Sequence, residues 1–347
     1  MLSLRPPTVW FNETSGSNLF TIHRLRANRD GDPVRVVCTH RNQHSALLQA
    51  ADVAQVEPDG LPAEDYAAWA LEFADRHGVD FFVPLRELAA VVGRAADFSA
   101  AGVALLVATL DHFDEVDNKA KCYEMCAALD IPVPRFIVAD DHDSYGAAFE
   151  LLRGEGLRVC HKPVRDIGGA GFRRVSDAAR GSADLYRPPG VDIALEDVLR
   201  LLEHAGRVQP PLMLCEYVSE PQYSVDCLAW EGRLLGAVAR IKHSPEVREI
   251  VERPDLVVYI RRLAAHLRLS GVFNVQFRGQ PHPRLMELNP RPSGGLHQSV
   301  AVEYLWEAIY MSLGGKPRPL PPEHPRFVAA LAAAFPFEGP EVRRPSR

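Results

Sequence analysis

Apolar residues recur with two different periods along the first third of the chain. Short apolar runs with the length of buried strands lie at 8–11, 34–39, 81–84 and 103–107. Segments with helical spacing lie between them, most clearly at 18–27 and 66–77. Strands that alternate with helices are typical of parallel βαβ units, so the pattern predicts an open parallel sheet with helices on its faces.

From about residue 111 the pattern indicates a second unit. A helix predicted at 119–129 ends before Pro132 and Pro134, because two prolines force an extended exit. Further helices are predicted at 145–153, 195–204 and 255–267, and strands at 135–138, 158–163, 212–218, 223–230, 233–242 and 271–277. The later strands follow one another as hairpins, so this unit has a mixed α+β character.

Polar side chains occupy alternate positions in the extended run that follows the last of these strands. Glu287, Asn289 and Arg291 stand two apart, so they share one face of a strand. If Pro281 forms the tip of a hairpin, Gln276 lies opposite Glu287. A carboxylate, amide oxygens and a guanidinium can hold a divalent cation and a phosphate together. The alternative is a solvated edge strand.

Composition limits the classes of protein to consider. The 347 residues are 47% hydrophobic and 24% charged, and a net charge of −6 argues against binding to duplex nucleic acid. No apolar run approaches the ~20 residues of a membrane helix, and the first residues lack the apolar core of a signal peptide. We therefore expect a cytoplasmic protein without a membrane partner.

The positions of the glycines, cysteines and histidines argue against several cofactors. The turn at 12–18 carries a single glycine, so a dinucleotide fingerprint for NAD or FAD is missing. The six cysteines show no CxxC spacing and are expected to be reduced, although Cys122 and Cys126 stand one helical turn apart. The thirteen histidines are scattered, so a zinc site is not expected.

Basic residues and glycines indicate where an anion would bind. Lys162 lies within a predicted buried strand, where an ammonium group must find an anion or lose its charge. The glycine-rich loop at 168–171 follows and can fold backbone N–H groups over a phosphate, although a hairpin turn is the alternative. Lys119 begins a helix, where a solvated helix end is the alternative. Arg240 and Lys242 place two positive charges on one strand face.

In this order the elements resemble the ATP-grasp superfamily, and within it the carboxylate-amine ligase branch. The resemblance covers about 113–313 and rests on five separated elements rather than on one motif. It implies an N-terminal open parallel sheet, the pre-ATP-grasp α/β domain, at 1–112, followed by a two-subdomain ATP-grasp fold at 113–313. A small lid subdomain would occupy about 135–216, and 314–347 would be a Pro-rich C-terminal extension.

The resemblance also implies roles for single residues. The phosphate-binding residues would be Lys119, Lys162 and the loop glycines Gly168, Gly169 and Gly171. The adenine hinge would be Cys215, Glu216, Tyr217 and Val218, with Gln222 at the ribose. The metal ligands would be Gln276, Glu287 and Asn289, with Arg291 beside the transferred phosphate. This sequence departs from the family pattern at Cys215 and Gln222, where acidic residues are common, and at the neutral ligand Gln276.

The activity that the resemblance implies is an ATP-dependent ligation. A small-molecule carboxylate would attack the γ-phosphate of ATP, and an amine would then attack the acyl phosphate, releasing phosphate and leaving an amide. ATP and one or two Mg²⁺ ions, with Mn²⁺ as a substitute, would be the cofactors. The predicted catalytic residues are Arg291, Lys162, Arg240 and Lys242.

Several points stay open at this level. A phosphotransferase, a carboxylase or a nucleotide-binding regulatory protein without turnover are the alternative functions. A helix is predicted to start at Leu296, where its N–H groups would face an oxyanion beside the small-residue loop 293–295, and His297 is either a base for the amine or a helix-end residue. The substrates are unidentified, although the first domain is predicted to line their pockets through 12–18, 41–44 and 86–87. A homodimer through that domain is the default expectation.

Overall fold

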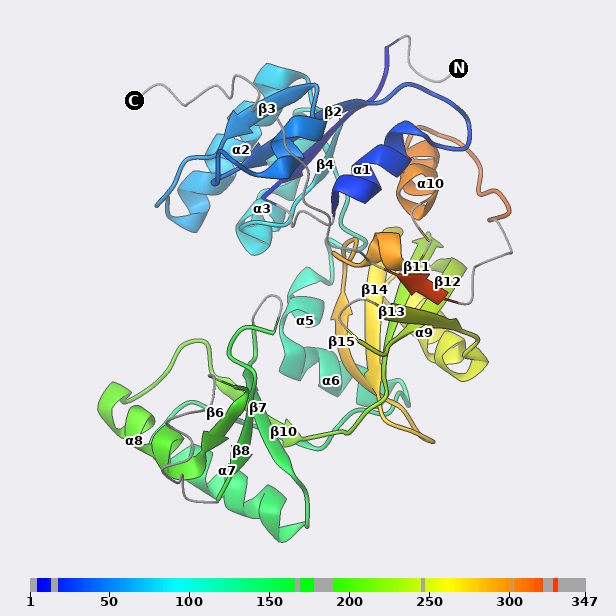
Figure 1. Ribbon diagram of the computed structural model, residues 1–347. Coiled ribbons are helices and arrows are strands. Elements are labelled where there is room, and N and C mark those ends of the chain that lie inside the picture. The colour runs from blue at the N-terminus through cyan, green and yellow to red at the C-terminus, as the bar shows by residue number, and fades with distance from the viewer. Residues whose placement is uncertain are drawn as a thin grey trace. The chain divides into compact units, whose positions relative to one another are not determined.

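The computed structural model describes residues 5–13, 18–165, 169–177, 190–244, 247–299, 301, 303–320 and 327–329 (Figure 1). Its contacts divide the chain into two compact units. Unit 1 comprises Met1–Phe113, Tyr223–Val275 and Asn289–Arg347, and unit 2 comprises Asp114–Gln222 and Gln276–Leu288. The chain passes between the units within two strands, β14 (Gly271–Arg278) and β15 (Arg284–Asn289).

The N-terminal part of unit 1 is an open parallel sheet, as the sequence predicts. Its strands are β1 (Thr8–Asn12), β2 (Arg35–His40), β3 (Val53–Val56), β4 (Phe81–Val83) and β5 (Ala104–Leu105). Their order in the sheet is β3-β2-β1-β4-β5. The direction of winding therefore reverses between β1 and β4, and such a switch point is where parallel sheets commonly bind ligands at their carboxyl ends.

Both faces of this sheet are covered. Helices α2 (Ala63–His77), α3 (Leu88–Gly93) and α4 (Ala95–Ala100) pack on the face of Trp10, whose ring stacks on Phe82 at 3.8 Å. On the other face, α1 (Asn18–Arg26) lies beside α10 (Glu303–Ser312), although the two are far apart in sequence (Figure 1). The short helix η1 (Ala46–Ala50) belongs to the same side.

Helix α10 is apolar on most of its circumference because it is buried on two sides. Leu305, Trp306 and Ile309 pack toward the parallel sheet. Tyr304, Ala308 and Met311 pack against Leu228, Val238 and Val272 of a second sheet. A helix that is hydrophobic all round is expected in such an interior position.

The second sheet contains the strands on which most of the predicted chemistry lies. Its members are β11 (Gln222–Trp230), β12 (Arg233–Lys242), β13 (Val247–Val251), β14, β15 and β16 (Phe327–Ala329), in the order β15-β14-β11-β12-β13-β16. Helix α9 (Pro254–His266) contacts β12. The predicted hairpin of β11 and β12 is present, and it turns at Glu231 and Gly232, both with positive φ.

Unit 2 contains a third sheet with helices on one face. Its strands are β6 (Phe136–Ala139), β7 (Val159–Pro163), β8 (Arg173–Ser176), β9 (Asp192–Ala194) and β10 (Leu212–Glu216), in the order β6-β10-β7-β8-β9. Helices α7 (His142–Gly154) and α8 (Leu195–Ala205) cover one face, where they pack on Val159, Val175 and Leu214. Helices α5 (Phe113–Asp117) and α6 (Lys119–Ala128) precede this sheet.

The predicted fold class is confirmed, since an open parallel sheet precedes two mixed α/β layers. One strand is shorter than predicted: the strand expected at 212–218 ends at Glu216. Among the helices in the described part of the chain, none has both the length and the apolar character needed to cross a membrane.

Candidate active site

Lys162 is a buried cation in the interior of a sheet. It lies on β7, between β10 and β8, and is 8% exposed. Its Nζ donates to the Tyr123 hydroxyl at 3.2 Å and to the Met286 carbonyl oxygen at 3.0 Å, and it lies 5.0 Å from the Tyr123 ring centroid. The ammonium group is thus held by neutral oxygens, which leaves its charge available to an anion.

Lys119 is buried as well, and is not the solvated helix end that was the alternative. Asn118 caps α6 by accepting hydrogen bonds from the N–H groups of Ala120 and Lys121. The Lys119 N–H donates to the Val164 carbonyl at 2.8 Å, which ties the start of α6 to the end of β7. Lys119 is 6% exposed, and its Nζ lies 3.6 Å from Glu287 Oε1. Two lysines that are distant in sequence therefore both reach β15.

Gln276 and Glu287 are paired across two strands, as the hairpin register predicts. Gln276 Nε2 donates to Glu287 Oε2 at 3.1 Å, and Gln276 Oε1 accepts from Gln222 Nε2 at 3.0 Å. A polar row of Gln222, Gln276, Glu287 and Lys119 results, and all four belong to unit 2. The predicted ribose residue Gln222 is thereby connected to the predicted metal ligands.

The residues predicted to bind magnesium include a single carboxylate. Among the residues described, no three His, Cys, Asp or Glu side chains form a metal cluster. The donor chemistry of Gln276, Glu287 and Asn289 nevertheless fits Mg²⁺, which takes oxygen ligands and shares them with phosphates. Gln276 would turn its amide so that Oε1 faces the ion. Asn289 and Arg291 belong to unit 1.

The predicted adenine hinge begins where β10 ends. The Glu216 N–H donates to the Arg135 carbonyl at 2.9 Å, and the Tyr217 N–H donates to the Arg158 carbonyl at 2.6 Å. The Glu216 carboxylate pairs with Arg284. Val218 packs closely on Gly279, where an added Cβ would lie 2.8 Å from Val218 Cγ1. These contacts fix the backbone of the segment from both sides.

The unusual hinge residue Cys215 lies opposite Cys160 on the neighbouring strand. The two Sγ atoms are 3.5 Å apart and both side chains are buried. The hydrogen bond from Cys160 lowers the pKa of the Cys215 thiol, whereas the Cys215 contact and burial raise the pKa of Cys160. All six cysteines of the chain are buried.

The glycine loop after β7 is partly described. Gly168 lies outside the described residues. Gly169 has φ +77 and Gly171 has φ +74, a backbone region that favours glycine. A Cβ on Gly171 would lie 2.8 Å from Pro163 Cγ and Cδ, whereas a Cβ on Gly169 would meet no atom within 4 Å. Gly171 is therefore required by both conformation and space, and Gly169 by conformation alone.

A second polar cluster lies in unit 1 around Arg240. The Arg240 Nε donates to Asp226 Oδ2 at 3.2 Å, and its Nη2 lies 3.3 Å from Ser293 Oγ. Ser293 Oγ and Asn274 Nδ2 both donate to Asp226 Oδ1, at 2.7 Å each. A Cβ on Gly295 would lie 2.6 Å from Arg240 Nη2, so the loop backbone packs directly on this guanidinium. Close packing against Arg240 therefore accounts for a small residue at position 295 of the predicted loop.

The helix predicted from Leu296 is present as a single 3₁₀ turn. The chain forms only the 3₁₀ helix η3 (Leu296–Gln298), and α10 begins at Glu303. The buried Ser299 hydroxyl donates to the Leu296 carbonyl at 2.8 Å, and such a side chain competes with helix continuation. His297 stacks on Phe20 at 5.7 Å, and burial lowers its pKa, followed by the charge of Arg240.

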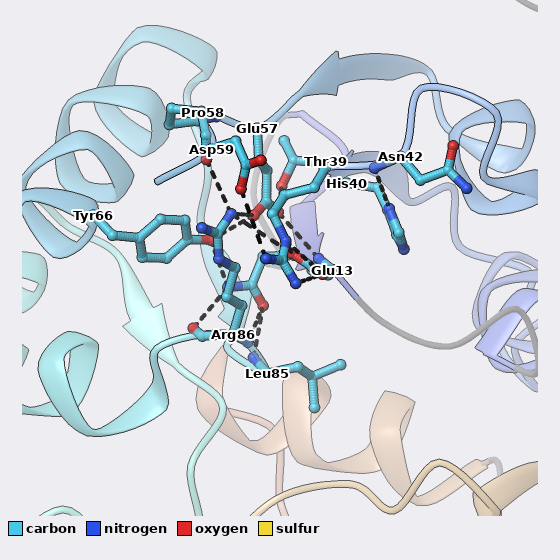
Figure 2. A network of polar contacts seen from close by, with 12 residues as sticks. Glu13, Thr39, His40, Asn42, Glu57, Pro58, Asp59, Tyr66, Leu85 and Arg86 are labelled. Carbon is cyan, nitrogen blue, oxygen red and sulfur yellow. Dashed lines mark hydrogen bonds and ion pairs between the residues drawn. The ribbon is translucent and has the colours of Figure 1, made fainter. Parts of the chain in front are cut away.

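The carboxyl ends of the parallel strands carry a third cluster (Figure 2). Asn12 accepts from the Leu85 N–H at 2.6 Å and donates to the Tyr66 hydroxyl at 2.9 Å. The fully buried Glu57 carboxylate accepts from Arg86 Nη1 at 2.9 Å, as well as from Thr39, Tyr66 and the Glu13 N–H. This network ties the end of β1 to the end of β4 at the switch point.

Some of the residues predicted to line substrate pockets belong to this network. Arg41 pairs with Glu13, and Arg86 with Glu57. Residues 14–17 lie outside the described part of the chain. Glu57 was not predicted as a site residue, because the preceding run 53–56 is short and interrupted by Gln55, which leaves only a weak strand signal.

Other site residues were also not predicted from the sequence. Tyr123 lies in a helix of mixed polar and apolar residues and is not distinguished by its neighbours, yet it contacts Lys162. Asp226 and Arg248 are charged residues in extended runs, and their burial is visible only in the structure. A charged residue between apolar neighbours in a strand is the signal that sequence reasoning could have used.

Comparisons with known proteins support the fold and the family. Residues 208–332 match a family described as ATP-grasp in the biosynthetic pathway with Ter operon. The structure is similar to the biotin carboxylase domain of Hydrogenobacter thermophilus 2-oxoglutarate carboxylase, solved with MgADP, ADP and bicarbonate. That similarity has a TM-score of 0.66 at 16% identity and covers 90% of this chain and 70% of that one. Part of the chain thus matches an ATP-grasp family model, and the fold as a whole is that of ATP-grasp proteins.

Two further proteins are similar to this chain. The L-amino acid ligase of Bacillus licheniformis superposes with a TM-score of 0.61 at 14% identity, covering 90% of this chain and 75% of that one. The large chain of carbamoyl phosphate synthase from Pyrococcus furiosus is 24% identical over 275 residues. This match covers 70% of the chain but only 24% of that protein.

Proposed function

We propose that the chain is an ATP-dependent ligase that joins a small-molecule carboxylate to an amine through an acyl phosphate. The observation that supports this most directly is the approach of two buried lysines to one strand. Lys119 Nζ lies 3.6 Å from Glu287, and Lys162 Nζ lies 3.0 Å from the Met286 carbonyl. Two buried ammonium groups beside a single carboxylate leave a net positive charge that suits a polyphosphate.

In the first step the substrate carboxylate attacks the γ-phosphorus of ATP and ADP leaves. Lys119 and Lys162 would neutralise charge on the phosphates, and the backbone of 216–218 would orient the adenine. Gln276, Glu287 and Asn289 would hold Mg²⁺, which supplies charge neutralisation for phosphoryl transfer when it is bound. The protein's contribution is mainly position and charge, as in other phosphoryl transfers.

In the second step the amine attacks the acyl carbon, the carbon–oxygen bond to phosphate breaks, and the amine loses a proton. Arg291 would stabilise the leaving phosphate, assisted by Arg240 and Lys242. His297 has a lowered pKa because it is buried and lies near Arg240. The neutral ring that results at pH 7 is compatible with a base, and this role is part of the proposal.

The relatives support this class without fixing the reaction. A ligase, a carbamoyl phosphate synthase chain and a biotin carboxylase domain are all similar to this chain. The chain spans about a quarter of the carbamoyl phosphate synthase chain, so the activity of that whole protein is not transferred to it. The carboxylase domain was solved with MgADP, which supports ATP and magnesium as the cofactors proposed here.

The test is an ADP-release screen with pooled carboxylates and amines, followed by mass spectrometry of any amide. Glu287→Ala and the isosteric Glu287→Gln are expected to abolish ADP formation, because each removes the single carboxylate of the metal set. Glu150→Ala, at an exposed position of α7, is the matched control and should retain full turnover. Thermal unfolding checks that the Glu287 variants remain folded.

The substrates on which ADP release depends separate this function from its alternatives. Amine-dependent ADP release with amide formation supports the ligase. Amine-independent release supports a phosphotransferase, bicarbonate-dependent release a carboxylase, and binding of ATP without release a regulatory protein. Undiminished turnover in Glu287→Gln would contradict the assigned metal ligand.

A further inference from the structure

Two cysteines face each other across neighbouring strands of the sheet in unit 2. Cys160 on β7 is directly opposite Cys215 on β10 in the antiparallel pairing of these strands. Their Sγ atoms are 3.5 Å apart, and the two side chains are 1% and 0% exposed. The thiols are therefore in direct contact in the interior of one compact unit.

The backbone at this pair has the spacing that a disulfide requires. The Tyr217 N–H donates to the Arg158 carbonyl at 2.6 Å, so these two residues form a hydrogen-bonded pair. Cys160 and Cys215 lie two positions along the same register and form the next hydrogen-bonded pair, in which the Cα atoms are about 5.5 Å apart. Disulfides span Cα separations of roughly 4.4–6.8 Å. The sulfur atoms would have to approach by about 1.5 Å to reach the bonding distance of about 2 Å.

The two thiols differ in acidity. The hydrogen bond from Cys160, and the charge of Lys162, lower the pKa of the Cys215 thiol against the opposing effect of burial. The contact with Cys215 and burial raise the pKa of Cys160. Cys38, a buried cysteine of unit 1, has its pKa raised to about 12 by burial. Because the thiolate is the reactive form, Cys215 is the nucleophile of the pair and Cys160 is the resolving thiol.

The thiol pair lies beside the residues predicted to bind nucleotide. Cys160 and Lys162 stand two apart on β7, so their side chains lie on the same face of the sheet. The other face of β7 carries His161, which is oriented toward α7. Cys215 directly precedes Glu216, the first residue whose backbone the predicted adenine hinge uses. A bond between the two sulfurs would therefore join the strand of Lys162 to the start of the hinge.

We propose that Cys160 and Cys215 are a redox-sensitive thiol pair that hydrogen peroxide converts into a disulfide, and that this bond weakens nucleotide binding at the hinge. The disulfide rests on the geometry of unit 2 alone, whereas its effect on the nucleotide rests on the proposed function. Closing the gap between the sulfurs shifts the backbone that carries Lys162 and Glu216. Groups that hold a ligand lose their contacts when they are displaced by about 1 Å.

The reaction balances with one molecule of peroxide. The Cys215 thiolate attacks a peroxide oxygen, the O–O bond breaks, and the released hydroxide takes up the proton that the thiol lost. Cys215 is then a sulfenic acid, and the Cys160 sulfur attacks it while the S–O bond breaks. The leaving hydroxide takes up the proton of Cys160. Two thiols and one hydrogen peroxide thus give one disulfide and two water molecules, with the sulfur atoms oxidised and the peroxide reduced.

The disulfide is detected on the full chain without nucleotide. The reduced protein is treated with hydrogen peroxide, the remaining thiols are blocked with iodoacetamide, and the peptides are identified by mass spectrometry without reduction. Two of the six thiols should be lost, with two peptides joined through Cys160 and Cys215, and dithiothreitol should restore both thiols. Cys160→Ser should lose this linkage. Cys38→Ser, at a buried position of β2, is the matched control and should keep it.

The replacements at position 160 are chosen to preserve the fold. In Cys160→Ser the hydroxyl can donate to the Cys215 carbonyl oxygen, which the Cys160 Sγ approaches at 3.4 Å. Cys160→Ala is a second variant that leaves no polar group in the interior. Thermal unfolding under reducing conditions checks that both variants are folded.

Calorimetric titration with MgATP measures the effect on the nucleotide. Oxidation should raise the dissociation constant of the unmodified chain and of Cys38→Ser about tenfold, and dithiothreitol should reverse the change. Peroxide-treated Cys160→Ser should bind MgATP as it does before treatment. This comparison separates the effect of the disulfide from oxidation of methionines or of other cysteines.

The outcomes are separable from those of the ligase proposal. Retention of both thiols after peroxide treatment, or linkage of other cysteines in their place, overturns the thiol pair. An unchanged dissociation constant in the oxidised chain overturns its effect on the nucleotide. If the reduced chain binds no MgATP, the proposed function fails instead, and the disulfide, which is measured without nucleotide, still stands.

Discussion

Single buried residues in unit 2 show how strongly burial controls protonation. His161 stands next to Lys162 on β7 but is oriented toward α7, where Tyr145 Oη lies 2.6 Å from its Nδ1. Burial, and after it the charge of Arg173, lowers the pKa of His161 to about 4. The two neighbouring side chains therefore have different surroundings. Lys162 Nζ is held among oxygen atoms, whereas burial keeps the His161 ring neutral.

The lowered pKa of His161 makes the stability of the protein depend on pH. Between pH 6.5 and about 4 the unfolded chain binds a proton at this histidine and the folded chain does not, so stability decreases as the pH falls. From pH 7 to pH 5 the free energy of unfolding should decrease by about 2 kcal/mol from this group. Urea unfolding monitored at both pH values measures the difference.

Two substitutions isolate the effect of His161. His161→Phe should remove this part of the pH dependence, whatever it does to stability at pH 7. Tyr145→Phe loses the same hydrogen bond but keeps the titrating ring, so it should retain the dependence. An unchanged pH dependence in His161→Phe would show that other groups cause it.

At the scale of elements, the glycine loop between β7 and β8 allows a comparison of two similar positions. Gly169 and Gly171 both have positive φ, but only at Gly171 would an added Cβ meet Pro163, at 2.8 Å. Gly169→Ala should cost about 1 kcal/mol for the left-handed backbone alone. Gly171→Ala should cost more, because the proline ring or the loop must also move. Urea unfolding and ATP titration of both variants measure the difference, and equal effects would contradict the assigned contact.

How far the elements could be predicted depends on the range of their interactions. Strands β11, β12, β14 and β15 follow from local alternation and from tight connections, so the pairing of Gln276 with Glu287 was predictable. The parallel pairing of β8 with β9 is non-local, and neither short strand carries a strong apolar signal. No local pattern shows that α10 packs between two sheets, because its burial depends on residues distant in sequence.

The residues of the candidate site also divide into those that a local pattern predicts and those that only the three-dimensional structure shows. Lys162, Glu287 and the glycine loop were predictable because their residue types conflict with a plain strand or turn. The burial of Arg248 was not, since a charged residue in a strand is usually on a solvated face and only the structure shows that this one is buried. The helix expected from Leu296 forms only as the 3₁₀ turn η3, after which the Ser299 hydroxyl donates to the Leu296 carbonyl.

At the scale of the whole molecule, the two compact units divide the predicted site residues. Unit 2 holds the polyphosphate, hinge and first metal residues, namely Lys119, Lys162, Glu216, Tyr217, Val218, Gln222, Gln276 and Glu287. Unit 1 holds the predicted residues Asn289, Arg291, Arg240 and Lys242. The chain crosses between the units inside β14 and β15, and the predicted nucleotide contacts lie in unit 2.

Hydrogen exchange should therefore show a nucleotide footprint within unit 2. MgATP is expected to slow exchange in peptides of β7 and β10, because the proposed nucleotide contacts restrict the hinge and the glycine loop. In Glu287→Gln this footprint should be weakened, because the single carboxylate of the proposed metal set is lost, whereas in Glu150→Ala it should be kept. Slowed exchange confined to β12 and β13 would contradict the assignment of the nucleotide residues to unit 2.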